Sequence, residues 1–261
     1  MNFVDTHAHV YKEYYPKNFH EVVSRSVKAQ VTQIILPCVN ARSVPHIFEA
    51  VTAYPQLLFP LIGLHPIDVN DNYKEELSIL ETYLSRKEII GIGEVGIDMY
   101  HNPERLNEQI DAFEQQLQWA VSYQLPLSVH IRNGYEVAFS VLKNFKNQNL
   151  KGVLHCFSGG IQEAKWAINF GFKLGIGGVV TFKNNKLENI VRDVGIAHIV
   201  LETDAPFLAP HPYRGKENES AYIPLIADKI ATIFDISIDE VKQITTQNAW
   251  EVFTKISPYF S

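Results

Sequence analysis

Cysteine is scarce in this chain of 261 residues, which holds only Cys38 and Cys156. The two lie far apart and form no closely spaced pair of the kind that binds zinc or makes a redox disulfide. Their scarcity excludes a disulfide framework as the source of stability and fits a reducing compartment. We expect both to be buried free thiols.

Long apolar runs are also missing. No stretch approaches the roughly 20 apolar residues that a membrane helix requires. The first strand-like run begins at Asn2, where a secretory signal would need a basic segment followed by an apolar one. We therefore expect a cytoplasmic protein that makes no contact with a membrane.

Positive charge is not in excess. The 23 Lys and Arg residues face 29 Asp and Glu residues, which gives a formal net charge of -6. This excludes the broad basic surface of proteins that coat nucleic acid. An anionic substrate remains possible, because bound divalent cations reverse the local field inside a site.

Hydrophobic residues make up 46% of the chain, which is enough for one large core. Eight short apolar runs rich in β-branched residues predict strands at 3–6, 31–38, 57–64, 89–94, 125–131, 152–155, 172–176 and 199–204. Runs as continuously apolar as VTQIILPC suit a parallel sheet that is covered on both faces.

Helical spacing fills the intervals between these runs. It is clearest at Leu106, Ile110, Phe113, Leu117 and Val121, and weaker at 19–30, 43–54, 73–86, 135–146, 161–170 and 185–194. Eight strand–helix units predict an α/β fold, a (β/α)8 TIM barrel in a single domain spanning 1–261.

Two further patterns refine this fold. A capping-box pattern at 237–240 predicts a helix after the last strand, so we expect extra C-terminal helices on the outside of the barrel. A doubly wound nucleotide-binding sheet is disfavoured, because no GxGxxG follows the first strand.

Side chains that bind metals stand at the carboxyl ends of the predicted strands. They are His7, His9, Glu94, His130, His155 and Asp204. The carboxyl ends of barrel strands meet at one rim, so residues far apart in sequence become neighbours there. We therefore predict one metal centre formed by all six.

The two acids in this set need a compensating charge. Glu94 and Asp204 each follow a buried apolar run, where an unpaired carboxylate is costly. A metal ion satisfies that requirement, and so does a structural ion pair with Arg132 or Arg214.

Four imidazoles and two carboxylates exceed what one tetrahedral ion needs. We therefore predict two divalent ions with Glu94 between them, and the histidine-rich ligands favour Zn2+ or Mn2+. One ion would take His7, His9 and Asp204, and the other His130 and His155. Asp204 can also accept a proton from water, which makes it the predicted general base.

Five motifs run along almost the whole chain: DTHAH at 5–9, GLHP at 63–66, GEVGID at 93–98, HCFSG at 155–159 and LETDAP at 201–206. In this order and spacing they resemble the TatD family of metal-dependent DNases, within the amidohydrolase-like barrels. The resemblance implies the same six ligands and adds His65 as a residue that contacts or orients the substrate during catalysis. It also implies Mg2+ or a transition metal.

The resemblance further implies a function. The expected activity is cleavage of DNA phosphodiester bonds from the 3′ end, with single strands or duplex ends as substrate. Arg132 matches the family pattern and, with Arg214, is expected to bind substrate phosphates. We expect a monomer without an obligate protein partner.

Two positions depart from the family pattern. Asn133 stands where the family often has an acidic residue, and Ser220 stands where it commonly has proline. We expect these departures to change local substrate contacts and the shape of a loop without loss of metal.

Other functions use the same ligands. A binuclear hydrolase of carboxylic esters, lactones or D-aminoacyl-tRNA activates water in the same way. A non-catalytic binding protein with a structural metal would need only four ligands, so six argue against it. Tyr100, Phe157 and Phe207 follow ligand-bearing strands and either stack on exposed bases or pack beneath loops.

Overall fold

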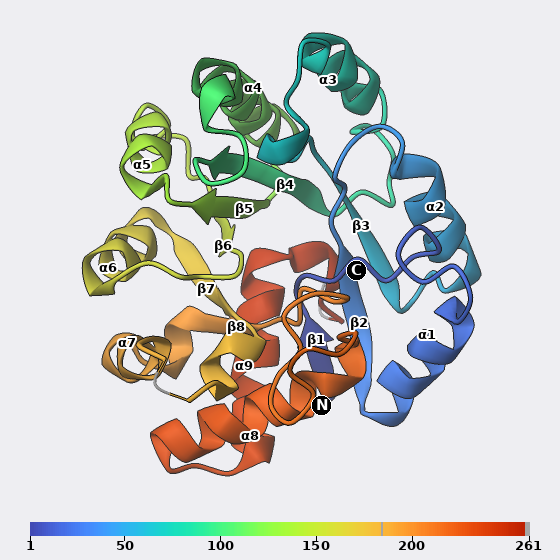
Figure 1. Cartoon of the computed structure of the whole chain (residues 1–261), viewed down its shortest axis with the longest axis vertical. Coiled ribbons are helices and arrows are strands. Elements are labelled where there is room, and N and C mark those ends of the chain that lie inside the picture. Colours follow the sequence, from blue (N-terminus) through green and yellow to red (C-terminus); the bar gives the residue numbers. More distant parts are fainter. Residues whose placement is uncertain (184, 259–261) are drawn as a thin grey trace.

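Eight parallel strands form the centre of the protein in a computed structural model that describes residues 1–183 and 185–258. They are β1 (Phe3–Asp5), β2 (Val31–Leu36), β3 (Leu58–Ile62), β4 (Gly91–Asp98), β5 (Leu127–Arg132), β6 (Gly152–Leu154), β7 (Phe172–Ile176) and β8 (Ile199–Leu201). Each pairs with the next along the chain (Figure 1). A parallel bridge between Ala8 and Ala205 joins the two ends of the sheet. The predicted (β/α)8 barrel is confirmed.

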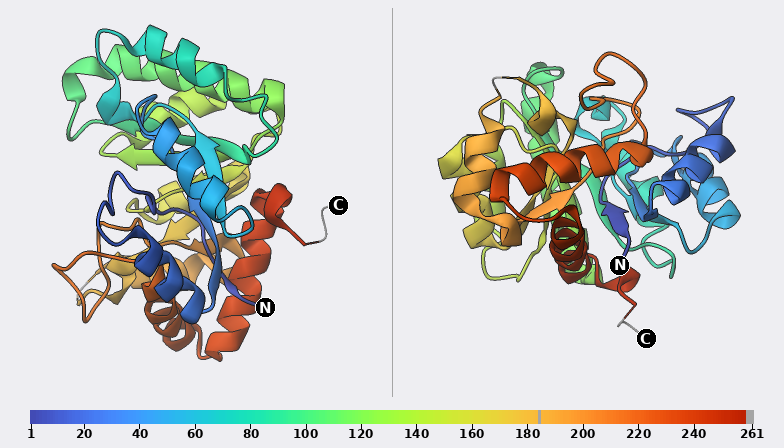
Figure 2. Two further views of the ribbon diagram at one scale, coloured as in Figure 1. Left: turned by 90° about the vertical axis from the view of Figure 1, so that its right-hand side faces the viewer. Right: turned by 90° about the horizontal axis from the view of Figure 1, so that it is seen from below.

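Helices surround the strands on the outside, as two perpendicular views show (Figure 2). The first seven are α1 (Phe19–Lys28), α2 (Val44–Ala53), α3 (Tyr73–Glu81), α4 (Leu106–Tyr123), α5 (Tyr135–Lys143), α6 (Ile161–Phe170) and α7 (Leu187–Val194). All seven fall where the apolar spacing predicted them, although α3 ends earlier than expected. Over the described ranges, no helix has the length and apolar character needed to cross a bilayer.

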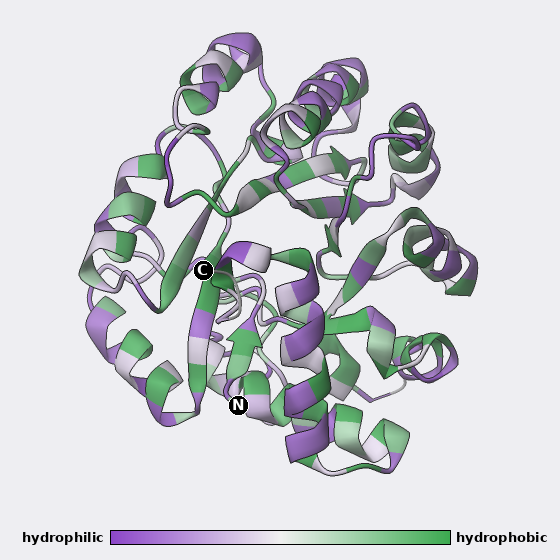
Figure 3. Cartoon of the chain, turned by 180° about the vertical axis from the view of Figure 1, so that it is seen from behind, coloured by the Kyte–Doolittle hydropathy of each residue, from purple (hydrophilic) through white to green (hydrophobic). Residues whose placement is uncertain are grey.

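Two C-terminal helices follow β8, α8 (Ile223–Phe234) and α9 (Ile238–Val252). The predicted capping box is present, because Ser237 Oγ accepts from the backbone N–H of Glu240 and the Glu240 carboxylate accepts from that of Ser237. The end of α9 lies deeper than we expected. One cluster joins its last turn to Val4, Ile35 and Val200, which belong to β1, β2 and β8. Figure 3 shows this helix across the back of the barrel.

β4 differs most from the expected strand. It was predicted to end at Glu94 but continues to Asp98, so Glu94 lies inside it. The pairing of β4 with β5 changes register between Ile92 and Val95, a bulge that changes the direction of the side chains there. Only glycine fits at Gly96, because its φ is +140° and a Cβ would lie 2.0 Å from the backbone oxygen of His130.

Two buried glutamines on α4 fix the ends of neighbouring strands. Gln116 Oε1 accepts from the backbone N–H of Leu64 at 2.7 Å, next to His65. Gln109 Oε1 accepts from the backbone N–H of Asp98 at 2.8 Å. The two glutamines are seven residues apart and therefore share one helix face. The rim is thus held in place by hydrogen bonds from an outer helix.

Candidate metal centre

One oxygen of the buried Glu94 carboxylate faces His7 and His9. Glu94 Oε2 lies 3.2 Å from His7 Nε2 and 3.8 Å from His9 Nε2. Asp204 Oδ1 lies 4.0 Å and 3.8 Å from the same two nitrogen atoms. Ligand atoms of a tetrahedral zinc ion stand about 3.3 Å apart. His7, His9 and Glu94 offer ligand atoms close enough together to share one cation, and so do His7, His155 and Asp204.

The other carboxylate oxygen of Glu94 faces three more imidazoles. Glu94 Oε1 lies 3.0 Å from His130 Nδ1, 3.1 Å from His65 Nε2 and 3.5 Å from His155 Nε2. Glu94 thus stands between two groups of nitrogen donors, as a bridging carboxylate would. His155 was predicted to bind a different ion from His7. Its ring nevertheless stacks on that of His7 with centroids 3.4 Å apart, so His155 lies close to both groups of ligands.

Three of these imidazoles form a hydrogen bond to an outer group with the ring nitrogen that faces away from Glu94. The contacts are His7 Nδ1 to Ser128 Oγ (3.0 Å), His9 Nδ1 to the Tyr11 hydroxyl (3.1 Å) and His130 Nε2 to Asp98 Oδ2 (2.9 Å). His155 Nδ1 lies 3.1 Å from Glu202 Oε1 but has no hydrogen-bond partner among the described residues. Metal-binding histidines usually hold their second nitrogen in this way, because the outer acceptor fixes the ring and its tautomer. The inner nitrogen then keeps its lone pair for a cation.

His65 is arranged differently. Its Nδ1 accepts from the backbone N–H of Ile67 at 3.0 Å, so the proton of a neutral ring lies on Nε2. That Nε2 faces Glu94 Oε1 as a donor. His65 is therefore suited to donate a hydrogen bond at the rim, in keeping with its expected role toward the substrate.

The protonation of the donor groups fits a divalent cation. Burial lowers the pKa of His7 and His9, and it lowers the pKa of His155 to about 4, so these rings are neutral near pH 7. His7 Nε2 is fully buried and has no hydrogen-bond partner among the described residues. Burying a nitrogen atom without a partner costs free energy, unless a cation or another group interacts with it. The donor set is thus able to bind divalent metal.

The surroundings shift the pKa values of Glu94 and Asp204 in opposite directions. Burial opposes ionisation of Glu94, but the imidazoles of His65 and His7 outweigh it and hold its pKa well below the usual range. Burial, together with the charges of Glu94 and Glu202, raises the pKa of Asp204 well above its ordinary value. Glu94 is therefore the stable anion of the centre, while Asp204 is the stronger base.

His130 holds a proton when only protein groups surround it. Burial disfavours its charged form, but hydrogen bonds to Asp98 and Glu94 prevail and raise its pKa to about 9. A cation at Nδ1 must therefore displace a proton.

Below the ligands, Asp5 joins the first and last strands. Its carboxylate accepts from the Thr203 hydroxyl at 2.6 Å and from the backbone N–H groups of Thr203 and His7 at 3.0 Å and 3.3 Å. The N–H of Asp204 donates to the carbonyl of His7 at 2.9 Å. These bonds hold Asp204 at φ +56°, a left-handed conformation that is strained for most side chains. They also explain why DTHAH and LETDAP occur together.

The two arginines do not neutralise the acids of the centre. Arg132 lies over the Tyr100 ring at 4.5 Å, and Arg214 lies over the Phe182 ring at 4.6 Å. Neither forms an ion pair with Glu94 or Asp204 in the part of the chain that the structure describes. The alternative of a structural Arg–carboxylate pair is therefore wrong, and both arginines remain predicted substrate contacts.

The two departures from the family pattern have local explanations. Asn133 follows β5 at φ +54°, a left-handed conformation that asparagine and aspartate tolerate better than most residues. Ser220 is buried and opens a short 3-10 helix ahead of α8. Asn218, two residues earlier, holds the loop by donating to the carbonyls of Thr203 and Phe207.

The residues that contact the outer ring nitrogens were not predicted from the sequence, although each lies close to a predicted ligand along the chain. They are Ser128, Tyr11, Asp98 and Glu202. Ser128 is two residues before His130 on one strand, so both point to the same face. Tyr11 follows His9 by the same interval. Asp98 and Glu202 lie inside GEVGID and LETDAP, the same motifs that contain the predicted ligands Glu94 and Asp204.

Replacing Asp98 by asparagine is expected to weaken metal binding about 10- to 100-fold, because the carboxylate that orients His130 is lost. Competition with a chelator would measure the affinity. Asp111→Asn makes the same change on an exposed part of α4 and should leave the affinity unchanged. Equal affinities of Asp98→Asn and the unaltered protein would contradict a role for Asp98 in holding His130.

Comparisons with known proteins show the family of this chain. A family model described as TatD related DNase matches residues 4–254. An uncharacterized metal-dependent hydrolase of Bacillus subtilis, YabD, is 32% identical over 95% of this chain and 98% of its own. The relative YcfH of Escherichia coli, also described as an uncharacterized metal-dependent hydrolase, is 30% identical over 97% and 96%.

Solved structures extend the agreement to the fold. The TatD homologue YjjV of Escherichia coli superposes with a TM-score of 0.88 at 26% identity, covering 97% of this chain and 98% of that one. A TatD family hydrolase of Entamoeba histolytica superposes with a TM-score of 0.85 at 20% identity over 100% and 99% of the two chains, which shows a shared fold. The chain belongs to the family of TatD-related DNases.

Proposed function

We propose that this protein is a binuclear metal-dependent hydrolase that cleaves phosphodiester bonds in DNA. The observation that carries the proposal is the position of Glu94, whose two oxygens face separate groups of imidazoles. A carboxylate so placed can bridge two cations. The family to which the chain belongs supports DNA as the substrate.

The groups at the centre have different roles in the proposed hydrolysis. Divalent cations held by the imidazoles and carboxylates around Glu94 would lower the pKa of water and stabilise the charge that develops on the phosphate. Asp204 accepts the proton of the attacking water through a carboxylate oxygen, as the one carboxylate besides Glu94 among the candidate ligands. His65 donates from Nε2 to a phosphate or leaving-group oxygen. Arg132 and Arg214 bind phosphates further along the strand.

Two exposed aromatic rings support a substrate with accessible bases. Tyr100 and Phe207 are 58% and 47% exposed on rim loops, whereas Phe157 is buried. Exposed rings can stack on the bases of a single strand, while Phe157 packs beneath its loop. We therefore favour single strands or frayed ends as the substrate. The proposed 3′-to-5′ direction of cleavage is the one that the resemblance to the TatD family implies. We further propose a cytoplasmic monomer, in keeping with its free cysteines.

Metal content gives the first test. Protein reloaded with Mn2+ or Zn2+ is expected to bind about two ions per chain, because Glu94 faces two donor groups. Elemental analysis after removal of free metal would measure this stoichiometry, and Mg2+ binding would be followed by calorimetry. One ion per chain would contradict a binuclear centre.

Substrate choice gives the second test. Metal-loaded protein would be assayed on single-stranded DNA, duplex DNA, a lactone and a D-aminoacyl-tRNA, with labels at both DNA ends to report the direction of cleavage. We expect the highest kcat/KM on single-stranded DNA, with loss of nucleotides from the 3′ end. Turnover of the lactone or aminoacyl ester without cleavage of DNA would replace this proposal with a carboxylic ester hydrolase.

A further inference from the structure

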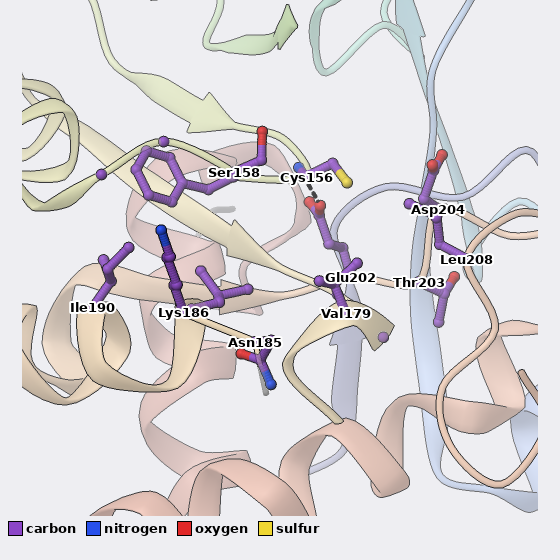
Figure 4. A pocket seen from close by; sticks show the side chains of 16 residues that line it. Cys156, Ser158, Val179, Asn185, Lys186, Ile190, Glu202, Thr203, Asp204 and Leu208 are labelled. Carbon is purple, nitrogen blue, oxygen red and sulfur yellow. Dashed lines mark hydrogen bonds between the residues drawn. The ribbon is translucent and has the colours of Figure 1, made fainter. Parts of the chain in front are cut away.

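A pocket of about 410 Å3 opens beside Asp204, between the loops that follow β6, β7 and β8. Figure 4 shows Cys156 and Ser158 on one side of it, Lys186 and Ile190 on the facing side, and Asp204 at one end. A group that enters the pocket therefore lies next to Asp204. Apart from Asp204 and Glu202, the residues that line the pocket have no role in metal or substrate binding assigned above.

The walls of this pocket are mostly apolar. Phe157, Val179, Leu187, Ile190 and Leu208 line it. A phosphate or other charged group would lose hydration against these apolar side chains, and only Lys186 at the exposed edge of the lining could compensate it. An apolar cavity of about 150 Å3 accommodates benzene. The pocket therefore has room for a planar two-ring group with part of its sugar.

The lack of a side chain at Gly177 leaves space in the lining of the pocket. Gly177 follows β7, and a Cβ built on it would meet only ordinary contacts, at 3.6 Å and 3.9 Å, with Glu202. Packing thus does not require a glycine at this position, and its lack of a side chain preserves space in the pocket. The exposed Lys186 provides a cation on the lining, suited to a phosphate on the far side of the bound group.

We infer that this pocket binds the nucleobase of the nucleotide adjoining the scissile bond, through its apolar walls and without selection of sequence. The inference rests on the proposed function and names the part of the substrate that the pocket takes. Ring faces of all bases pack equally well against apolar side chains, so cleavage is tolerant of sequence.

The experiment compares diesters with and without a base. The substrates are thymidine 5′-(4-nitrophenyl phosphate), its 3′ isomer and methyl 4-nitrophenyl phosphate. We expect kcat/KM for one thymidine ester to exceed that of the methyl ester at least about tenfold. The isomer preferred reports which side of the phosphate the pocket serves.

Filling the pocket should remove that preference. Ile190→Trp is expected to lower kcat/KM on the preferred thymidine ester about tenfold while changing the methyl ester less than about twofold. Gly177→Val adds a side chain at another point of the lining and should act in the same way, so that a folding failure of one variant leaves the other to test the inference. Ile79→Trp places the same ring on the exposed face of α3 and serves as the matched control.

Binding to metal-free protein supplies a readout without catalysis. Calorimetry should show that dAMP binds at least about tenfold more tightly than 2-deoxyribose 5-phosphate, and that Ile190→Trp abolishes the difference. Equal affinities, or equal rates on thymidine and methyl esters, would overturn the inference and leave diester hydrolysis intact. Failure to cleave any of the diesters would instead contradict the proposed function, phosphodiester hydrolysis. Hydrolysis of 4-nitrophenyl butyrate that is lost on Ile190→Trp would assign the pocket to an acyl chain.

Discussion

Replacement of Glu94 by glutamine is expected to lower the rate of hydrolysis at least about 1,000-fold, which corresponds to about 4 kcal/mol of transition-state stabilisation. Glutamine keeps the size of the side chain but offers one neutral oxygen in place of two anionic ones. The imidazoles on its two sides then lose the charge that lies 3.0 Å to 3.8 Å from their nitrogens. We expect metal content to fall from two ions to one or none.

The measurement pairs elemental analysis with single-turnover rates at saturating metal. Glu251→Gln removes the same charge from α9, where Glu251 binds Lys173 away from the rim, and should leave both quantities unchanged. Circular dichroism would establish that the Glu94 variant is folded. Two tightly bound ions together with a rate near that of the unaltered protein would show that Glu94 does not bridge.

The second large effect concerns Asp204. Asp204→Asn is expected to lower kcat about 100- to 10,000-fold, because the amide retains an oxygen toward the metals but accepts no proton from water. KM should change much less, since the groups that bind phosphate are untouched. This combination distinguishes the loss of a base from the loss of substrate binding.

Asp193→Asn makes the matched change on the exposed surface of α7 and should leave kcat unaltered. Metal content would be measured in the same preparation. Loss of metal in proportion to loss of rate would make Asp204 a ligand alone and would contradict its role as the base. DNA cleavage that persists at the original rate would show that a contaminating nuclease produced the activity.

Local patterns predicted the architecture well. Apolar runs such as VTQIILPC can be buried on both faces only in a parallel sheet with helices on each side, and the chain alternates such runs with helical spacing. The predicted helices lie where they were expected because the apolar stripe of each must pack against the strands.

The candidate ligands were also predictable, because imidazoles and carboxylates at strand ends stand out against apolar neighbours. Their hydrogen-bonding roles were not. His65 and His130 both face Glu94, yet the N–H of Ile67 makes His65 a donor, while Asp98 fixes His130 through its outer nitrogen. These differences depend on atoms that reach the rings from other turns and strands.

Alone, then, the sequence determined the barrel and placed the six candidate ligands on one rim, because burial and strand direction follow from the residue pattern along the chain. Tertiary structure decided the placement of Glu94 on a bulge within β4, the outer partners of the histidines and the pocket beside Asp204. The physical reason is that these features are set by contacts between strands and loops distant in sequence. Such contacts exist only once the sheet has closed.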